Sequence, residues 1–72
     1  MDRHEATALL KEIIDAGLAE PSFVVLKENR HGKFDLLIKD DYNLDRIRTF
    51  VAKKNLNVKE DKAKGYRTIF RP

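Results

Sequence analysis

Apolar side chains near the start of the chain recur every three or four positions, which predicts an amphipathic helix over residues 3–16. The stripe consists of Ala6, Leu9, Leu10, Ile13 and Ile14. Asp2 followed three residues later by Glu5 matches a capping box, with Asp in the Ser/Thr role. Gly17 stands where a left-handed residue would end the helix, and Leu18 would supply the hydrophobic contact behind it.

The next segment predicts a β-hairpin. Residues 23–28 are rich in β-branched and aromatic side chains, residues 29–32 form a turn that contains a glycine, and residues 33–39 form the return strand. In the return strand, alternate positions are apolar, and we expect three of them to face the core: Phe34, Leu36 and Ile38. Asp35, Leu37 and Lys39 then face the other way.

The second half of the chain repeats the order of helix, strand and strand. A helix is predicted over residues 40–54, because acidic residues open it and lysines close it, in keeping with the helix dipole. Its apolar stripe is Leu44, Ile47, Phe50 and Val51. Asn55 is a left-handed stop. Strands follow at residues 56–60 and 66–71, joined by a turn at residues 61–65, and Leu56 and Val58 should face the core.

In the last strand, both alternating sets of side chains contain large apolar groups. We expect Tyr66, Thr68 and Phe70 to point into the core, and Arg67, Ile69 and Arg71 to point outward. A register shift of one residue would reverse every one of these assignments and expose both aromatic rings.

These elements predict a single α+β domain spanning residues 1–72, in the order αββαββ. Two helical stripes on one sheet face make a two-layer sandwich. A right-handed crossover from the second strand to the third leaves room for the fourth strand between them, so the predicted antiparallel sheet order is 1-2-4-3. This topology resembles a circularly permuted ferredoxin-like sandwich with its first strand moved to the C-terminus.

The composition excludes several classes of protein and of metal site. The 72 residues include no cysteine, which excludes a disulfide framework and a thiolate metal site. No apolar run approaches the roughly 18 residues that span a membrane. The charged N-terminus lacks the apolar region of a signal peptide. We therefore expect a complete, soluble, cytoplasmic protein with no membrane partner.

The charge is unevenly divided along the chain. Residues 46–72 carry nine basic and two acidic side chains, 9 − 2 = +7, whereas residues 1–45 carry six basic and ten acidic ones, 6 − 10 = −4. The sum is the net charge of +3. Such asymmetry indicates an anionic partner.

Catalytic chemistry finds no support in the sequence. His4 and His31 have no partner at metal-ligand spacing, and the single serine, Ser22, follows a proline at the start of a strand. Asp40 and Asp41 are typical of helix N-terminal capping rather than of a magnesium site. We expect no enzyme activity, no cofactor and no metal.

The basic C-terminal hairpin and the sheet face opposite the helices are the candidate binding surface. Its basic residues are Lys39, Lys59, Lys62, Lys64, Arg67 and Arg71. Flexible cationic side chains of this kind contact phosphate backbones, which favours a small module that binds RNA or DNA. The sequence leaves two alternatives to the binding of RNA or DNA. In the first, the charges form an ordinary solvated surface; in the second, Leu37 and Ile69, with apolar residues of the first strand, form a patch for a protein partner or a homodimer.

Overall fold

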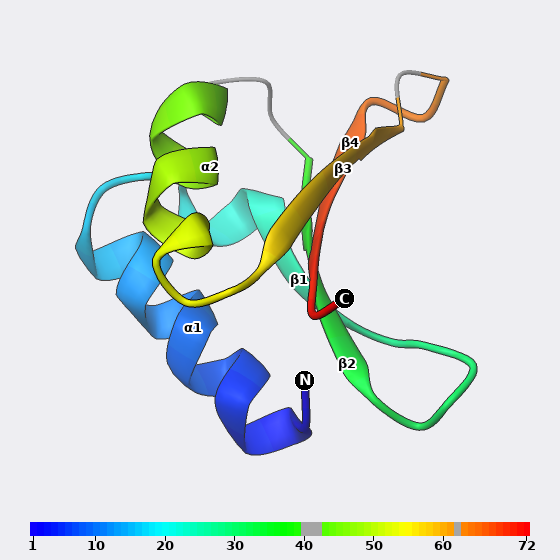
Figure 1. The fold of residues 1–72 in the computed structure, drawn as a ribbon. Coiled ribbons are helices and arrows are strands. Elements are labelled where there is room, and N and C mark those ends of the chain that lie inside the picture. Colours follow the sequence, from blue (N-terminus) through cyan, green and yellow to red (C-terminus); the bar gives the residue numbers. More distant parts are fainter. Residues whose placement is uncertain (40–42, 62) are drawn as a thin grey trace.

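The computed structural model describes residues 1–39, 43–61 and 63–72. It contains two α-helices and four strands in the predicted order αββαββ (Figure 1). The elements are α1 (Arg3–Asp15), η1 (Pro21–Phe23), β1 (Val24–Glu28), β2 (Phe34–Ile38), α2 (Leu44–Ala52), β3 (Asn57–Asp61) and β4 (Tyr66–Phe70). Phe23 was expected to begin the first strand, but it ends a 3₁₀ turn that starts at Pro21.

The four strands form one antiparallel sheet in the order β1-β2-β4-β3, as predicted. Because β4 pairs antiparallel with both β2 and β3, those two strands run in the same direction on either side of it. The helix α2 connects them along the chain. The α+β sandwich is therefore confirmed.

Both helices pack on the same face of the sheet (Figure 1). One cluster of buried side chains joins the two layers, and α1 contributes Ala6, Leu9 and Ile13 to it. Ile47 and Val51 come from α2. The sheet supplies Val24, Leu36, Ile38 and Ile69. Among the described residues, no helix covers the opposite face of the sheet.

Local sequence determines where α1 begins and ends. The Glu5 N–H donates to Asp2 Oδ1 at 2.7 Å, so Asp2 caps the helix as predicted. Gly17 has φ +70°, which a residue without Cβ adopts at no steric cost. The Leu18 N–H donates to the Ile13 carbonyl at 3.0 Å, and this bond completes a Schellman motif whose hydrophobic contact is buried.

The helix α2 ends in the same way without a glycine. Asn55 takes the left-handed conformation at φ +60°, as predicted, and the Leu56 N–H donates to the Val51 carbonyl at 3.1 Å. The residues expected to open α2, Asp40 and Asp41, lie outside the described part of the chain, and α2 is described from its N-cap Asn43 onward.

The predicted facing of the last strand is wrong. Ile69 is 0% exposed and belongs to the core, and Arg67 beside it is 5% exposed. Tyr66, Thr68 and Phe70 are only half-buried and face away from the helices. The strand register explains the reversal: Ile69 pairs with Leu36 on one side and with Val58 on the other, and both of these pack toward the helices.

Candidate functional site

The sheet face that turns away from the helices, here called the open face, gathers aromatic, basic and acidic side chains. Residues directly opposite one another in neighbouring strands point to the same side, so the strand register identifies its members. Thr68 of β4 pairs with Leu37 and Lys59, and Tyr66 pairs with Asp61. The open face comprises Val25, Lys27, Asp35, Leu37, Lys39, Asn57, Lys59, Asp61, Tyr66, Thr68 and Phe70.

Two aromatic rings lie on β4, one of the two central strands. Tyr66 and Phe70 are both half-buried, so each ring retains surface that solvent can reach. They are four positions apart along one strand, which corresponds to a spacing of about 13 Å. Leu37 lies across from Thr68, between the two rings, and is 8% exposed although it is outside the core cluster. The face therefore has an apolar floor flanked by two rings.

Lysines border these rings. Lys39 Nζ lies 5.8 Å from the centroid of the Tyr66 ring, a cation–π distance. Lys59 is exposed beside Thr68, and Lys27 lies across from Asp35. Within residues 1–39, 43–61 and 63–72, these three ammonium groups form no ion pair.

The basic groups on the helix side behave differently. Arg48 Nη2 lies 3.5 Å from Glu60 Oε1, and Lys54 Nζ lies 2.7 Å from Glu12 Oε2. Each pair joins two elements. These two cations serve contacts within the protein, whereas Lys27, Lys39 and Lys59 form no ion pair among the described residues.

An open hollow of about 750 Å³ lies on the open face. Phe70, Asp35 and Lys59 line it together with Lys27 and Thr68. The β1–β2 hairpin extends away from the helices (Figure 1), and residues from both hairpins line the hollow. A hollow that combines an aromatic ring, a carboxylate and ammonium groups suits a planar, polar ligand.

The structure separates the predicted basic site into two groups. Lys39 and Lys59 share the open face, and Lys64 is exposed on the β3–β4 turn. Lys62 lies outside the described residues. The outward position predicted for Arg67 is wrong, because this side chain is nearly buried on the helix side, where Glu60 is its register partner.

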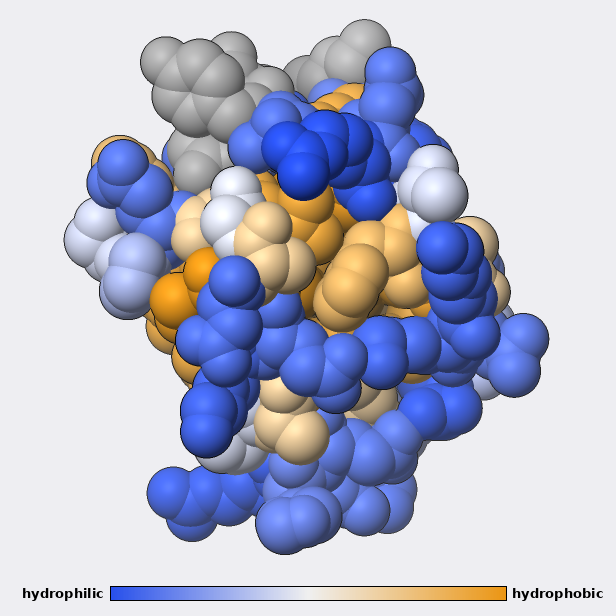
Figure 2. Space-filling view, turned by 90° about the vertical axis from the view of Figure 1, so that its left-hand side faces the viewer, coloured by the Kyte–Doolittle hydropathy of each residue, from blue (hydrophilic) through white to orange (hydrophobic). Residues whose placement is uncertain are grey.

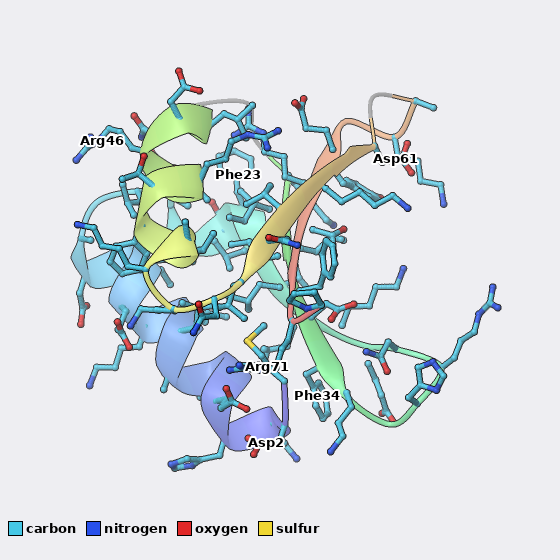
Figure 3. The ribbon with its side chains drawn as sticks, in the orientation of Figure 1. Asp2, Phe23, Phe34, Arg46, Asp61 and Arg71 are labelled. Carbon is cyan, nitrogen blue, oxygen red and sulfur yellow. The ribbon has the colours of Figure 1, made fainter. Side chains whose placement is uncertain are left out.

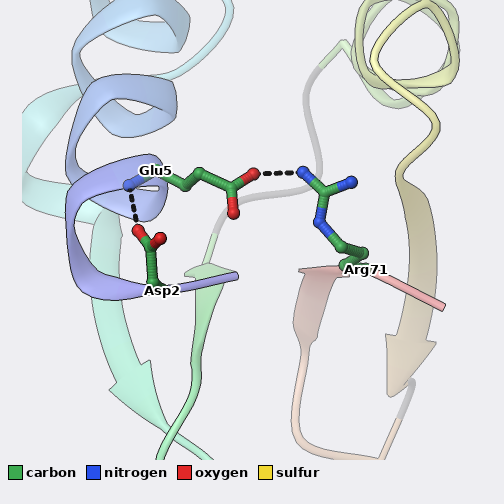
Figure 4. A network of polar contacts seen from close by, with 3 residues as sticks. All are labelled: Asp2, Glu5 and Arg71. Atoms are coloured by element: carbon green, nitrogen blue, oxygen red, sulfur yellow. Dashed lines mark hydrogen bonds and ion pairs between the residues drawn. The ribbon is translucent and has the colours of Figure 1, made fainter.

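Arg71 also belongs to the helix side. Its guanidinium is paired with the Glu5 carboxylate of α1, so the C-terminal end of the chain is tied to the first helix (Figure 4). Glu5 therefore contacts Arg71 instead of completing the capping box with its side chain. The Glu5 N–H still donates to Asp2, and this hydrogen bond is the main reason why the pKa of Asp2 is lowered.

A second hollow, of about 410 Å³, lies between the helices on the opposite side of the molecule. Leu18 and Phe50 form part of its wall, and Arg46 and Lys53 lie at its border. Figure 2 shows this side as an apolar depression surrounded by hydrophilic residues. Arg46 extends from α2 away from the sheet (Figure 3), so it has no access to the open face.

The two histidines lie far from one another in the sequence and on different elements. His4 and His31 are both exposed, one in the first turn of α1 and the other at the β1–β2 turn. Among the residues with described positions, no group of three or more His, Asp or Glu side chains is placed to hold a metal ion. No helix in the same part of the chain has the length and apolar character needed to cross a membrane.

No protein-family model, curated protein or solved structure matches this chain in the comparisons. The ferredoxin-like permutation consequently stays a resemblance of topology.

Sequence reasoning assigned the aromatic residues of the site to the core. Tyr66 and Phe70 alternate with Arg67 and Ile69, and both sets contain large apolar surface, so hydrophobicity did not separate them. The signal that separates the two sets is the pattern of inward-facing residues in the two adjacent strands. Leu36 and Val58 are the inward residues of the adjacent strands, and the register pairs both with Ile69. Ile69 does not belong to the predicted apolar patch, since it lies in the core, whereas Leu37 and its strand-one neighbour Val25 do share the open face.

Proposed function

We propose that this protein is a small non-enzymatic module that binds single-stranded RNA or DNA on the open face. The observation that carries the proposal is the pair of half-exposed rings, Tyr66 and Phe70, on a central strand. Bases of unpaired nucleotides stack on such rings, and each stacking contact contributes about 1–3 kcal/mol. A duplex hides the base faces and cannot use these rings.

The lysines of the open face support the proposal. Lys27, Lys39 and Lys59 are free of ion pairs in the described part of the chain, so binding a phosphate breaks no existing contact of this kind. The ammonium group of Lys39 lies over the Tyr66 ring, so a base that stacks on this ring displaces it, and the flexible side chain then reaches the phosphate of the same nucleotide. Release of counterions from the nucleic acid then favours association.

The same face carries two carboxylates, Asp35 and Asp61. Three lysines against two aspartates leave a net charge of 3 − 2 = +1, so electrostatic attraction alone would be weak. Stacking must provide a large part of the affinity, which distinguishes this surface from a purely basic patch. We also propose a cytoplasmic setting, because the chain has no cysteine that an oxidising compartment would stabilise.

The test is a fluorescence anisotropy titration with a labelled single-stranded oligonucleotide of about eight residues. At about 50 mM salt we expect a Kd of roughly 1–100 µM, which weakens as salt is raised. A duplex of the same sequence should bind more weakly. Absence of binding at tens of micromolar protein would contradict the proposal.

A matched pair of variants assigns the binding to the open face. Phe70→Leu keeps an apolar side chain but removes the ring, and it should weaken binding about 5- to 150-fold. Phe50→Leu makes the same change on the helix side, where Phe50 lies next to Lys54 Nζ at 5.5 Å from its ring centroid. It should leave affinity unchanged. Equal losses from both variants would argue against a site on the open face.

A further inference from the structure

Asp35 is the open-face residue that the proposed function leaves unexplained. It is half-buried on β2 and lines the hollow that also contains Phe70 and Lys59. Among residues 1–39, 43–61 and 63–72 it forms no hydrogen bond or ion pair. A carboxylate repels phosphate, so a surface that only tracked a nucleic-acid backbone would gain nothing from it.

Asp35 and Phe70 line the same hollow of the open face. The β2–β4 register ends at the pair Leu36 and Ile69, and Asp35 and Phe70 each lie one residue beyond that pair. A base stacked on the Phe70 ring would therefore present an edge to the Asp35 carboxylate.

Lys59 lies on the other side of β4. It pairs with Thr68, and Asn57 pairs with Phe70, so Lys59 is diagonal to the ring on β3. The Phe70 ring thus has a hydrogen-bond acceptor on one flank and a donor on the other. Both Asp35 and Lys59 line the same hollow as Phe70.

We propose that the Phe70 subsite selects guanine, with Asp35 as the specificity-determining residue; this inference rests on the proposed function of the open face. An ionised carboxylate only accepts hydrogen bonds, and two parallel N–H donors suit its two oxygens best. Guanine offers this pair at N1 and N2 on its Watson–Crick edge. Its other edge carries the acceptors O6 and N7, which suit the Lys59 ammonium group.

The other bases fit this arrangement less well. Adenine turns the acceptor N1 toward the carboxylate, uracil has a single N–H between two carbonyl oxygens, and cytosine has one amino group beside the acceptor N3. Each of these therefore places an acceptor against Asp35. Inosine is guanosine without the N2 amino group, so it isolates one of the two hydrogen bonds to the carboxylate.

The experiment uses uridine oligonucleotides of about eight residues that carry guanosine, inosine or adenosine near the centre. We expect the guanosine oligonucleotide to bind about 5- to 150-fold more tightly than the adenosine one, the range that a bidentate contact provides. Inosine should fall between them. Asp35→Asn keeps the size of the side chain, and it should bring all three affinities to within about 2-fold of one another.

Asp61→Asn is the matched control. Asp61 lies on the same face beside Tyr66, and its Oδ1 accepts from the Lys64 N–H at 3.2 Å within its own turn. This variant should keep the preference for guanosine. Asp35→Ser, with folding verified by circular dichroism, provides a second substitution at the site and should also abolish the preference.

The outcomes separate the two proposals. Equal binding of all oligonucleotides by the wild type, or a preference that survives in Asp35→Asn and Asp35→Ser, would overturn guanine selection and leave single-strand binding intact. Failure of every oligonucleotide to bind would overturn both. A preference lost in the Asp35 variants and kept in Asp61→Asn would support the assignment.

Discussion

The two faces of the sheet use the same strand for different purposes. On the helix side, β4 contributes Ile69, which is 0% exposed and belongs to the core cluster that also contains buried side chains of both helices. On the open face it contributes Tyr66 and Phe70, which are half-buried. Large apolar side chains therefore occur on both faces, but in the described part of the chain only one face has a layer of helices to cover them. The aromatic rings on the other face keep surface that solvent can reach.

The basic side chains on the two sides of the sheet also differ in their ion pairs. On the helix side, Arg48, Lys54 and Arg71 pair with carboxylates from other elements. On the open face, the lysines of the described chain have no such pair. Arg46 and Lys53, which also lie on the helix side, form no ion pair among the described residues, so the contrast concerns these three pairs rather than the whole side.

The largest expected effect tests the difference in packing between the two faces of the sheet. Ile69→Ala should lower the free energy of unfolding by about 2–5 kcal/mol, because it opens a cavity between the sheet and the helices. Urea denaturation followed by circular dichroism measures the change. If the variant does not fold, Ile69→Val should still show a loss of about 0.5–1.5 kcal/mol.

Thr68→Ala is the control on the open face of the same strand. It should cost less than about 1 kcal/mol, since Thr68 is half-buried and has no helix above it. A Thr68→Ala loss as large as that of Ile69→Ala would mean that the two faces are equally packed.

The next effect tests the difference between basic side chains on the open face and those on the helix side. Lys59→Gln removes an open-face lysine and should flatten the salt dependence of single-strand binding by about 0.7 in the log–log slope, the value for one phosphate contact. Arg46→Gln removes one charge from the far side of α2 and should leave the slope as in the wild type. Titrations at several salt concentrations give both slopes. The same slope change in both variants would show a response to net charge alone.

A smaller effect concerns the C-terminal arginine. Arg71→Gln breaks the exposed ion pair with Glu5, whose side chains are 44% and 43% accessible, and should cost at most about 1 kcal/mol of stability. The loss should shrink further in high salt because the pair is screened. Arg71 also lines the hollow that contains Phe70, so this variant tests the stability of the ion pair and is not a control for binding. A loss of stability well above about 1 kcal/mol would show that the pair does more than an exposed ion pair does.

The smallest effect is the acid response of the first helix turn. The folded-state pKa of Asp2 is lowered from its ordinary value of 3.8, chiefly by the hydrogen bond from the Glu5 N–H. The stabilisation is therefore present above the unfolded pKa and is lost as pH falls through the folded pKa. Wild type should exceed Asp2→Asn in urea midpoint at neutral pH, and the two should converge in acid.

This last variant keeps a good N-cap, so it removes the charge with little other change. Binding to single strands at neutral pH should be the same for both proteins, since Asp2 belongs to the helix layer. A gap in urea midpoint that persists unchanged at low pH would show that the charge of Asp2 is not its cause.

Much of the fold was predictable because it depends on local chemistry. The Asp2 cap, the left-handed Gly17 and Asn55, and the alternation in β2 each act within a few residues of the chain. The pairing of Arg71 with Glu5 was not predictable, since 66 residues separate them and many acidic side chains were equally eligible. The candidate site was predictable only in part. Lys39 and Lys59 were assigned to the open face, but its rings were placed in the core.

The sequence alone determined the elements, their order, the sheet order and the concentration of positive charge toward the C-terminus. Only the tertiary structure decided which side of β4 is covered. Its two alternate sets of side chains are similar in apolar content, and the choice came from the register that places Ile69 between Leu36 and Val58, above the helices. An aliphatic β-branched side chain fills that enclosed position well, and strand alternation then requires both rings to face solvent.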